Sequence, residues 1–158
     1  MAGQKPLAVR MLEQRKIDHK VFAFDDSIRS AAEVARHTGM PPDHVLKTLV
    51  VELDPPKGRP YLVMVPSDRE IELKALARSL GVKSLRMASH ADAERHTGLK
   101  VGGISALALL GKGFTVLIDD SAAALSEVLV SAGQRGFDVR LAVSDLIALT
   151  GAKAVGTA

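Results

Sequence analysis

Two spacings of hydrophobic residues recur along this chain, and each predicts one kind of element. Apolar side chains three or four residues apart predict helices, whereas apolar residues that alternate with polar ones, or run together between turn residues, predict strands. The spacing predicts helices over 6–14, 31–37, 70–80, 90–96 and 145–149, and strands over 17–24, 45–53, 61–65, 84–87, 115–118, 125–130 and 137–141. This mixture, without a long linker or a repeat, predicts one mixed α/β domain over residues 1–158.

Capping and turn residues separate these elements. Ser30, with Glu33 three residues later, has the pattern of a capping box at a helix start. Ser144 is expected to be the N-cap of the last helix. The stretch 131–136 contains serine and two glycines, so we expect a turn between the last two strands. Short connections after Thr115 predict antiparallel pairing in that part of the chain.

The strand over 45–53 is expected to form a hairpin with 61–65, and it carries one anomalous charge. Because side chains alternate between the faces of a strand, Lys47 is the only charge on the more apolar face. An ammonium is costly to bury there unless it is paired or solvated. Two interpretations stay open: the face lines a pocket that needs a positive charge, or it lies near a sheet edge where the lysine stem reaches water.

Composition excludes several kinds of chemistry. The chain of 158 residues is 47% hydrophobic and 25% charged, which is ordinary for a globular domain. It has no cysteine, so a disulfide, a thiol nucleophile and a thiolate metal site are excluded. We find no signal-peptide core at the N-terminus and no apolar run of about 18 residues. A cytoplasmic protein without membrane association is the expectation.

Positive charge is concentrated in one part of the chain. Residues 74–112 contain seven Lys or Arg against two Asp or Glu, so this segment carries +5 while the rest carries −2. Such a segment could face a phosphate backbone, or it could be a solvated helix surface. Aromatic residues make up 3% of the chain, with no Trp, so stacking of several bases of a single-stranded nucleic acid on the protein is not expected.

Common catalytic motifs are absent from the sequence. There is no phosphate-binding loop and no dinucleotide fingerprint, and Ser105 lacks the second glycine of a nucleophile elbow. The five histidines are not spaced as ligands, so neither a metal nor another cofactor is expected. Two loops rich in Gly and Ser remain, at 100–105 and 131–136. They could present backbone N–H groups to a ligand oxygen, or they could be ordinary tight turns.

Three blocks of sequence resemble a known family. Residues 45–49 (Val-Leu-Lys-Thr-Leu), 101–105 (Val-Gly-Gly-Ile-Ser) and 130–138 (Val-Ser-Ala-Gly-Gln-Arg-Gly-Phe-Asp) are similar to the signature blocks of the YbaK/EbsC family of aminoacyl-tRNA deacylases. The resemblance covers nearly the whole chain. It implies a barrel-like, largely antiparallel sheet flanked by helices, and metal-free hydrolysis of an aminoacyl ester without a cofactor. The branch that the blocks resemble clears cysteine from proline tRNA, and its relatives clear alanine.

The resemblance also implies roles for individual residues. Lys47 matches the family's critical lysine, and in the cysteine-clearing branch the substrate's own thiol attacks the ester carbonyl. Residues expected to lie beside the terminal adenosine and the ester are Gly102, Gly103 and Ser105 in the first loop, Ser131, Gly133 and Asp138 in the second block, and Phe24.

Three residues depart from the family pattern. Phe24 stands where the cysteine-clearing proteins carry tyrosine, Ala106 replaces a proline, and Ala132 replaces a glycine. These departures concern the amino acid preferred more than the fold or the reaction class.

The expected partner is the acceptor stem and 3′ end of proline tRNA, with prolyl-tRNA synthetase as a further partner. Within the basic segment, Arg78, Lys83 and Arg86 are the candidate contacts to the tRNA. Three other functions stay open: a deacylase for another residue such as Ala-tRNA(Pro), a non-catalytic module that binds tRNA or a synthetase, and a small-molecule hydrolase that uses Ser105 or Ser131.

Overall fold

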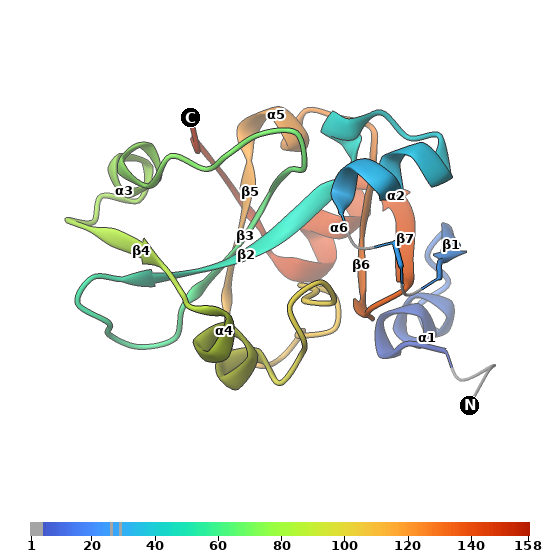
Figure 1. The fold of residues 1–158 in the computed structure, drawn as a ribbon, viewed down its shortest axis with the longest axis horizontal. Helices are drawn as coiled ribbons and strands as arrows, with labels where there is room; N and C mark the ends of the chain where they lie inside the picture. Colours follow the sequence, from blue (N-terminus) through green and yellow to red (C-terminus); the bar gives the residue numbers. More distant parts are fainter. Residues whose placement is uncertain (1–4, 26, 29) are drawn as a thin grey trace.

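The computed structural model describes residues 5–25, 27–28 and 30–158, and Figure 1 shows their arrangement. The first four residues, on which part of the signal-peptide expectation rests, lie outside these ranges. The helices are α1 (Leu7–Gln14), α2 (Ala31–Thr38), α3 (Leu73–Leu80), α4 (His90–Thr97), α5 (Asp120–Ala123) and α6 (Val143–Thr150), with a 3-10 turn η1 (Pro42–His44). The strands are β1 (His19–Ala23), β2 (Leu46–Leu53), β3 (Tyr61–Pro66), β4 (Leu85–Met87), β5 (Thr115–Asp119), β6 (Glu127–Gln134), β7 (Phe137–Ala142) and β8 (Lys153–Val155).

The larger sheet has the strand order β4-β2-β3-β5-β8. The expected β2–β3 hairpin is confirmed, and β4 pairs antiparallel with the far end of β2. The expectation that all strands after Thr115 are antiparallel is wrong for β5, which runs parallel to both β3 and β8. The physical reason is that α3, β4 and α4 form a long crossover between β3 and β5, and a crossover returns the chain in its original direction.

The smaller sheet is antiparallel, in the order β1-β7-β6. The expected turn at 131–136 is wrong in its extent, because β6 continues to Gln134 and only Arg135 and Gly136 lie between the strands. A register shift between Ser131 and Gln134 marks a bulge that contains Ala132 and Gly133, with Gly133 at a φ of 98°. A bulge takes the same small residues as a turn, so composition alone did not distinguish the two.

Among the described residues one parallel bridge, Val45 to Leu129, joins the two sheets, so these strands do not close into a continuous barrel. The mixed, antiparallel-rich α/β architecture is confirmed. The alternation along β2 is confirmed as well, because Leu46 and Val50 enter the main core with α1, β6 and β7, while Val51 enters a second core. Helix α3 packs on that second core, on the far side of the molecule from α1 and α2 (Figure 1).

The helix ends show which capping signals were sound. Ser30 and Glu33 form the expected capping box. The expected cap at Ser144 is wrong, because α6 begins at Val143, whose N–H donates to the carbonyl of Ser126 and needs no side-chain acceptor. The short elements α5 and β8 were not predicted. Within the described ranges, no helix combines the length and the apolarity needed to cross a bilayer.

Candidate active site

A pocket of about 530 Å³ lies where the start of β2 meets β6, β7 and the loop around residue 102. Its polar lining comes mainly from residues that the sequence singled out, and its apolar wall comes from the α2 region and β2. Five of the predicted site residues line it together: Phe24, Lys47, Gly102, Ser131 and Asp138. The pocket therefore gathers residues from segments that are more than 100 positions apart in the chain.

Strand pairing explains why three of these residues meet. Ser131 on β6 and Asp138 on β7 are directly opposed in the ladder. Lys47 and Ser131 each lie two residues beyond the parallel bridge from Val45 to Leu129, so they follow it in the same direction and on the same side. The order β2, β6, β7 thus presents an ammonium, a hydroxyl and a carboxyl to one cavity.

Lys47 is partly exposed and faces this cavity. It makes no hydrogen bond or ion pair with any residue that the structure describes. Its strand is not at an open edge, because β3 pairs with it at Val65 and the bridge to β6 lies two residues before it. The arrangement favours the pocket interpretation over a lysine that escapes to solvent from a sheet edge.

Among the titratable groups that line the pocket, Asp138 has the largest change in pKa. Its removal from water raises the pKa of its carboxyl from 3.8 to about 7, because burial disfavours the charged form. No ion pair joins it to Lys47. A carboxyl with a pKa near neutral can exchange a proton or bind an ammonium under ordinary conditions, which is typical of groups in functional sites.

The two glycine-rich segments pack directly on each other. A Cβ on Gly103 would lie 2.9 Å from the backbone N of Arg135, and one on Gly102 would lie 3.3 Å from Nε of the same residue. Arg135 Nε donates to the carbonyl of Val101 at 2.8 Å. The glycines are thus required for close approach, and the contact forms one wall of the pocket.

Three predicted residues do not line the main pocket. Gly103 and Gly133 instead border a neighbouring hollow of about 290 Å³. Ser105 is 1% exposed, and its Oγ accepts from the N–H of Ala108, so it holds the following turn. Ser131 does line the pocket, and its Oγ accepts from the N–H of Gly133. Neither serine contacts a histidine among the described residues.

Arg135 was missed by the sequence reasoning, although it lines both the pocket and the neighbouring hollow. The available signal was a single arginine inside the third block, between Gln134 and Gly136. It was overlooked because 131–136 was treated as a source of backbone donors, whereas the bulge of β6 leaves Arg135 at the tip of the hairpin.

The three candidate tRNA contacts lie away from the pocket. Arg78 is exposed on α3, Lys83 is exposed before β4, and Arg86 lies on β4. Arg86 is paired in the ladder with Glu52. Glu52 is five residues beyond Lys47 on β2, which corresponds to about 16 Å along the strand.

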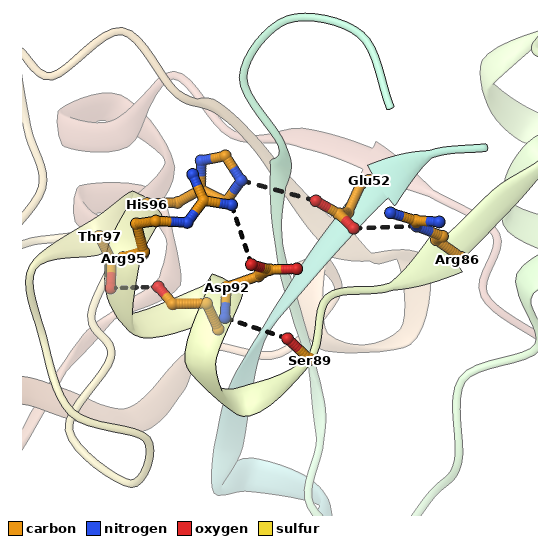
Figure 2. A network of polar contacts seen from close by, with 8 residues as sticks. Glu52, Arg86, Ser89, Asp92, Arg95, His96 and Thr97 are labelled. Carbon is orange, nitrogen blue, oxygen red and sulfur yellow. Dashed lines mark hydrogen bonds and ion pairs between the residues drawn. The ribbon is translucent and has the colours of Figure 1, made fainter. Parts of the chain in front are cut away.

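Figure 2 shows that Arg86 is partly committed to the protein itself. Its Nε donates to Glu52 at 3.0 Å, and Nε2 of His96 lies 3.5 Å from the other oxygen of that carboxylate. Glu52 is only 6% exposed, and a buried carboxylate is costly without such partners. Arg86 therefore has a structural role beside any role in binding.

Among the described residues, no cluster of three or more His, Cys, Asp or Glu is arranged to hold a metal ion.

Residues 25–149 match the family of the aminoacyl-tRNA editing domain. The chain belongs to this family. It is 35% identical over 149 residues to EbsC of Enterococcus faecalis, named as a candidate Cys-tRNA(Pro)/Cys-tRNA(Cys) deacylase, and the match covers 93% of this chain and 89% of that one. The resemblance to the YbaK/EbsC family is thus confirmed, and membership makes the protein an aminoacyl-tRNA deacylase, a hydrolase.

Two further relatives support this placement. A crystal structure described as a candidate trans-editing enzyme for prolyl-tRNA synthetase superposes with a TM-score of 0.81 at 26% identity, covering 98% of both chains. The proline–tRNA ligase of Geobacillus kaustophilus is 26% identical over 109 residues, which are 69% of this chain and 18% of the ligase.

The three residues that depart from the pattern of the cysteine-clearing proteins lie in different parts of the structure. Phe24 lines the pocket, and its ring meets that of His37 edge to face with centroids 6.2 Å apart. Ala106 and Ala132 are both buried in the main core, outside the pocket lining. Of the three departures, Phe24 is the one placed to contact a substrate directly.

The raised pKa of Asp138 in this editing domain gives a testable pH dependence. Because the folded-state pKa exceeds the unfolded one, the contribution of this group to stability is full below about pH 4 and is lost as the pH rises towards 7. Asp138→Asn removes this titration. The thermal midpoint of the variant minus that of the wild type should therefore increase as the pH is raised from 4 to 8. Asp145→Asn, on α6, is the matched control. Parallel midpoint curves for Asp138→Asn and the wild type would contradict the raised pKa.

Proposed function

We propose that this editing domain clears cysteine from mischarged Cys-tRNA(Pro) by trans-editing, without a metal. The observation that carries the proposal is a pocket with an unpartnered Lys47 and the polar groups of Ser131 and Asp138, but no serine paired with a histidine among the described residues. A site of this kind can orient and polarise an ester, while the nucleophile comes from the substrate or from water. The names of EbsC and of the trans-editing relative support the same substrate class.

The chemistry then follows from the substrate. The cysteine thiol loses its proton and its sulfur attacks the carbonyl carbon of its own ester. The bond from that carbon to the ribose oxygen breaks, and the ribose oxygen takes up a proton to become a hydroxyl. Water afterwards opens the cyclic thioester and releases free cysteine. Holding the thiol near the carbonyl replaces an encounter with an intramolecular step, which is worth several kcal/mol.

In this proposal the protein supplies orientation and charge. Lys47 attracts the terminal ribose or phosphate and strengthens the local field, because charges act more strongly in a partly desolvated site than in water. Asp138, with a pKa of about 7, faces the substrate's α-ammonium as a carboxylate or donates a proton as a carboxylic acid. Gly102 contributes an N–H that makes no hydrogen bond within the described ranges.

The test is deacylation of a panel of tRNA(Pro) charged with cysteine, serine, alanine or proline, in the presence of a chelator. Serine differs from cysteine only in the attacking atom, so it is the matched control. We expect cysteine to be released at least about 100-fold faster than serine or alanine. Equal release of alanine and cysteine would favour the alanine-clearing alternative, and loss of activity in chelator, restored by zinc, would contradict the metal-free mechanism.

The small-molecule hydrolase alternative depends on a serine nucleophile. Ser105 is buried, and the hydroxyl oxygens of Ser105 and Ser131 accept hydrogen bonds from the N–H groups of Ala108 and Gly133. Neither hydroxyl is thus arranged as a nucleophile. We expect Ser105→Ala and Ser131→Ala to retain measurable deacylation. Family membership among deacylases argues against a non-catalytic module. A contact with prolyl-tRNA synthetase stays a proposal, supported by the match to a segment of the Geobacillus ligase.

Binding of tRNA should depend on the basic surface around α3 and β4. Arg86 is omitted from the test because its reversal would place two carboxylates together at Glu52. The double reversal Arg78→Glu with Lys83→Glu should weaken tRNA binding. It should also weaken the salt dependence: the negative slope of log K against log salt should become shallower by about 0.7–0.9 for each phosphate that the variant no longer binds.

The matched control for this charge reversal is Arg10→Glu with Arg15→Glu, an equal change of charge on exposed residues of the α1 region. Both affinities are measured by titration over a series of salt concentrations. If the two double variants weaken binding equally, only net charge matters and the tRNA does not lie along α3.

A further inference from the structure

The hollow beside the main pocket has no role in the proposed function. It measures about 290 Å³ and is lined by residues of two segments: Gly98, Leu99, Lys100 and Gly103 from one, and Gly133, Gln134 and Arg135 from the other. Its volume is at the lower end of ligand sites, which are typically about 300–1,000 Å³. This size suits one sugar-phosphate unit with part of a base.

Arg135 connects this hollow to the main pocket, because it is the residue common to both linings. Only Nε of its guanidinium is used within the described protein, in the hydrogen bond to Val101. Its terminal nitrogens make no ion pair with a described carboxylate, and its side chain is exposed. A guanidinium fixed at one nitrogen and open at the others is well suited to a phosphate, which it can bind through two parallel N–H groups.

The rest of the lining also fits an anion. Lys100 adds a second exposed cation, and none of the described Asp or Glu residues lines the hollow. Three glycines line the hollow as well, Gly98, Gly103 and Gly133. Their N–H groups are already used where the bonds are defined, Gly103 with the carbonyl of Lys100 and Gly133 with Ser131, so recognition of charge falls to the two side chains.

We propose that this hollow binds the phosphodiester that links the terminal adenosine to the preceding nucleotide, with Arg135 and Lys100 as its ligands. The proposal rests on the function above, in which the main pocket takes the aminoacylated end. The terminal nucleotide is joined to the rest of the tRNA only through its 5′ phosphate, so the chain must leave the main pocket along one wall. Arg135 lines both cavities, and each cavity has a further cation, Lys47 in the main pocket and Lys100 in the hollow.

The test compares the cysteinyl ester of adenosine with the same ester on a CCA trinucleotide, which adds two cytidines and the phosphodiester that links them to the adenosine. Arg135→Ala should lower the ratio of kcat/KM for the trinucleotide over the nucleoside by about 10-fold or more, through KM. Lys100→Ala should lower it less, and Arg135→Lys should restore part of it. Arg10→Ala, an exposed arginine on α1, is the control that should leave the ratio unchanged.

A merely structural role for Arg135, through its bond to Val101, would reduce both substrates equally and overturn the proposal. An unchanged ratio in Arg135→Ala would overturn it as well. Calorimetric binding of uncharged CCA and of adenosine repeats the comparison without chemistry, and Arg135→Ala should remove the advantage of CCA. A wild-type protein that binds CCA more tightly than adenosine but hydrolyses neither ester would refute the proposed function and leave the phosphate site standing.

Discussion

Replacing Lys47 by alanine is expected to lower the rate of deacylation by at least about 100-fold while leaving the fold intact. The ammonium is partly desolvated in the pocket and has no partner among the described residues, so its field acts on whatever occupies the pocket. Its removal breaks no hydrogen bond or ion pair of the protein and relieves a desolvation cost. We therefore expect the free energy of unfolding to change by no more than about 1 kcal/mol.

Two further substitutions separate this role from that of a structural lysine. Lys47→Arg keeps the charge but replaces the compact ammonium with a planar guanidinium, so its rate should lie between those of the alanine variant and the wild type. Lys47→Met keeps the apolar stem and should be as inactive as alanine. If the stem alone mattered, methionine would be active, because the packing of the stem on β2 would be preserved.

The measurements are the thermal midpoint and the single-turnover rate with Cys-tRNA(Pro). Lys57→Ala, an exposed lysine in the turn between β2 and β3, is the matched control and should change neither. A folded Lys47→Ala protein that deacylates at the wild-type rate would show that Lys47 is not part of the active site.

Local signals predicted most elements of this fold, because they act within a few residues. The capping box at Ser30 and the alternation along β2 are both decided by neighbours in sequence, and both are confirmed. The parallel pairing of β5 with β3 was not predicted, because it depends on where a crossover of nearly 50 residues returns to the sheet. The short strand β8 is likewise defined by its partner rather than by its own sequence.

In the candidate site too, local features could be predicted from the sequence, whereas contacts between distant segments could not. Lys47 was identified locally, as a charge on an apolar strand face, and it does line a pocket. Its proximity to Ser131 depends on a single bridge between sheets, which no local pattern indicates. Ser105 was expected beside the ligand because its block resembles the family's loop there, and its hydroxyl is buried in the following turn. The three blocks thus point to segments that meet around one cavity, but they did not determine which side chains face it.

Gly133→Ala is expected to destabilise the protein by about 2–5 kcal/mol and to reduce deacylation, because it combines two costs. The residue has a φ of 98°, which disfavours any side chain, and a Cβ there would lie 2.6 Å from Cβ of Ala108. Relief of that overlap requires the bulge of β6 to move. Ser131 lies two residues away on the same strand and lines the pocket, so the displacement should reach the active site.

Two variants separate the overlap from the backbone strain. Gly111→Ala has a similar φ of 76° with nothing within 4 Å, so it carries the conformational cost alone, about 1–2 kcal/mol. Ala108→Gly added to Gly133→Ala removes the overlapping atom and should recover part of the stability and of the rate. Chemical denaturation of all three variants, beside their single-turnover rates, provides the comparison. If Gly133→Ala were no less stable than Gly111→Ala, the close packing of the bulge on the residue 108 turn would not matter, and the pocket wall at β6 would be more adaptable than its contacts indicate.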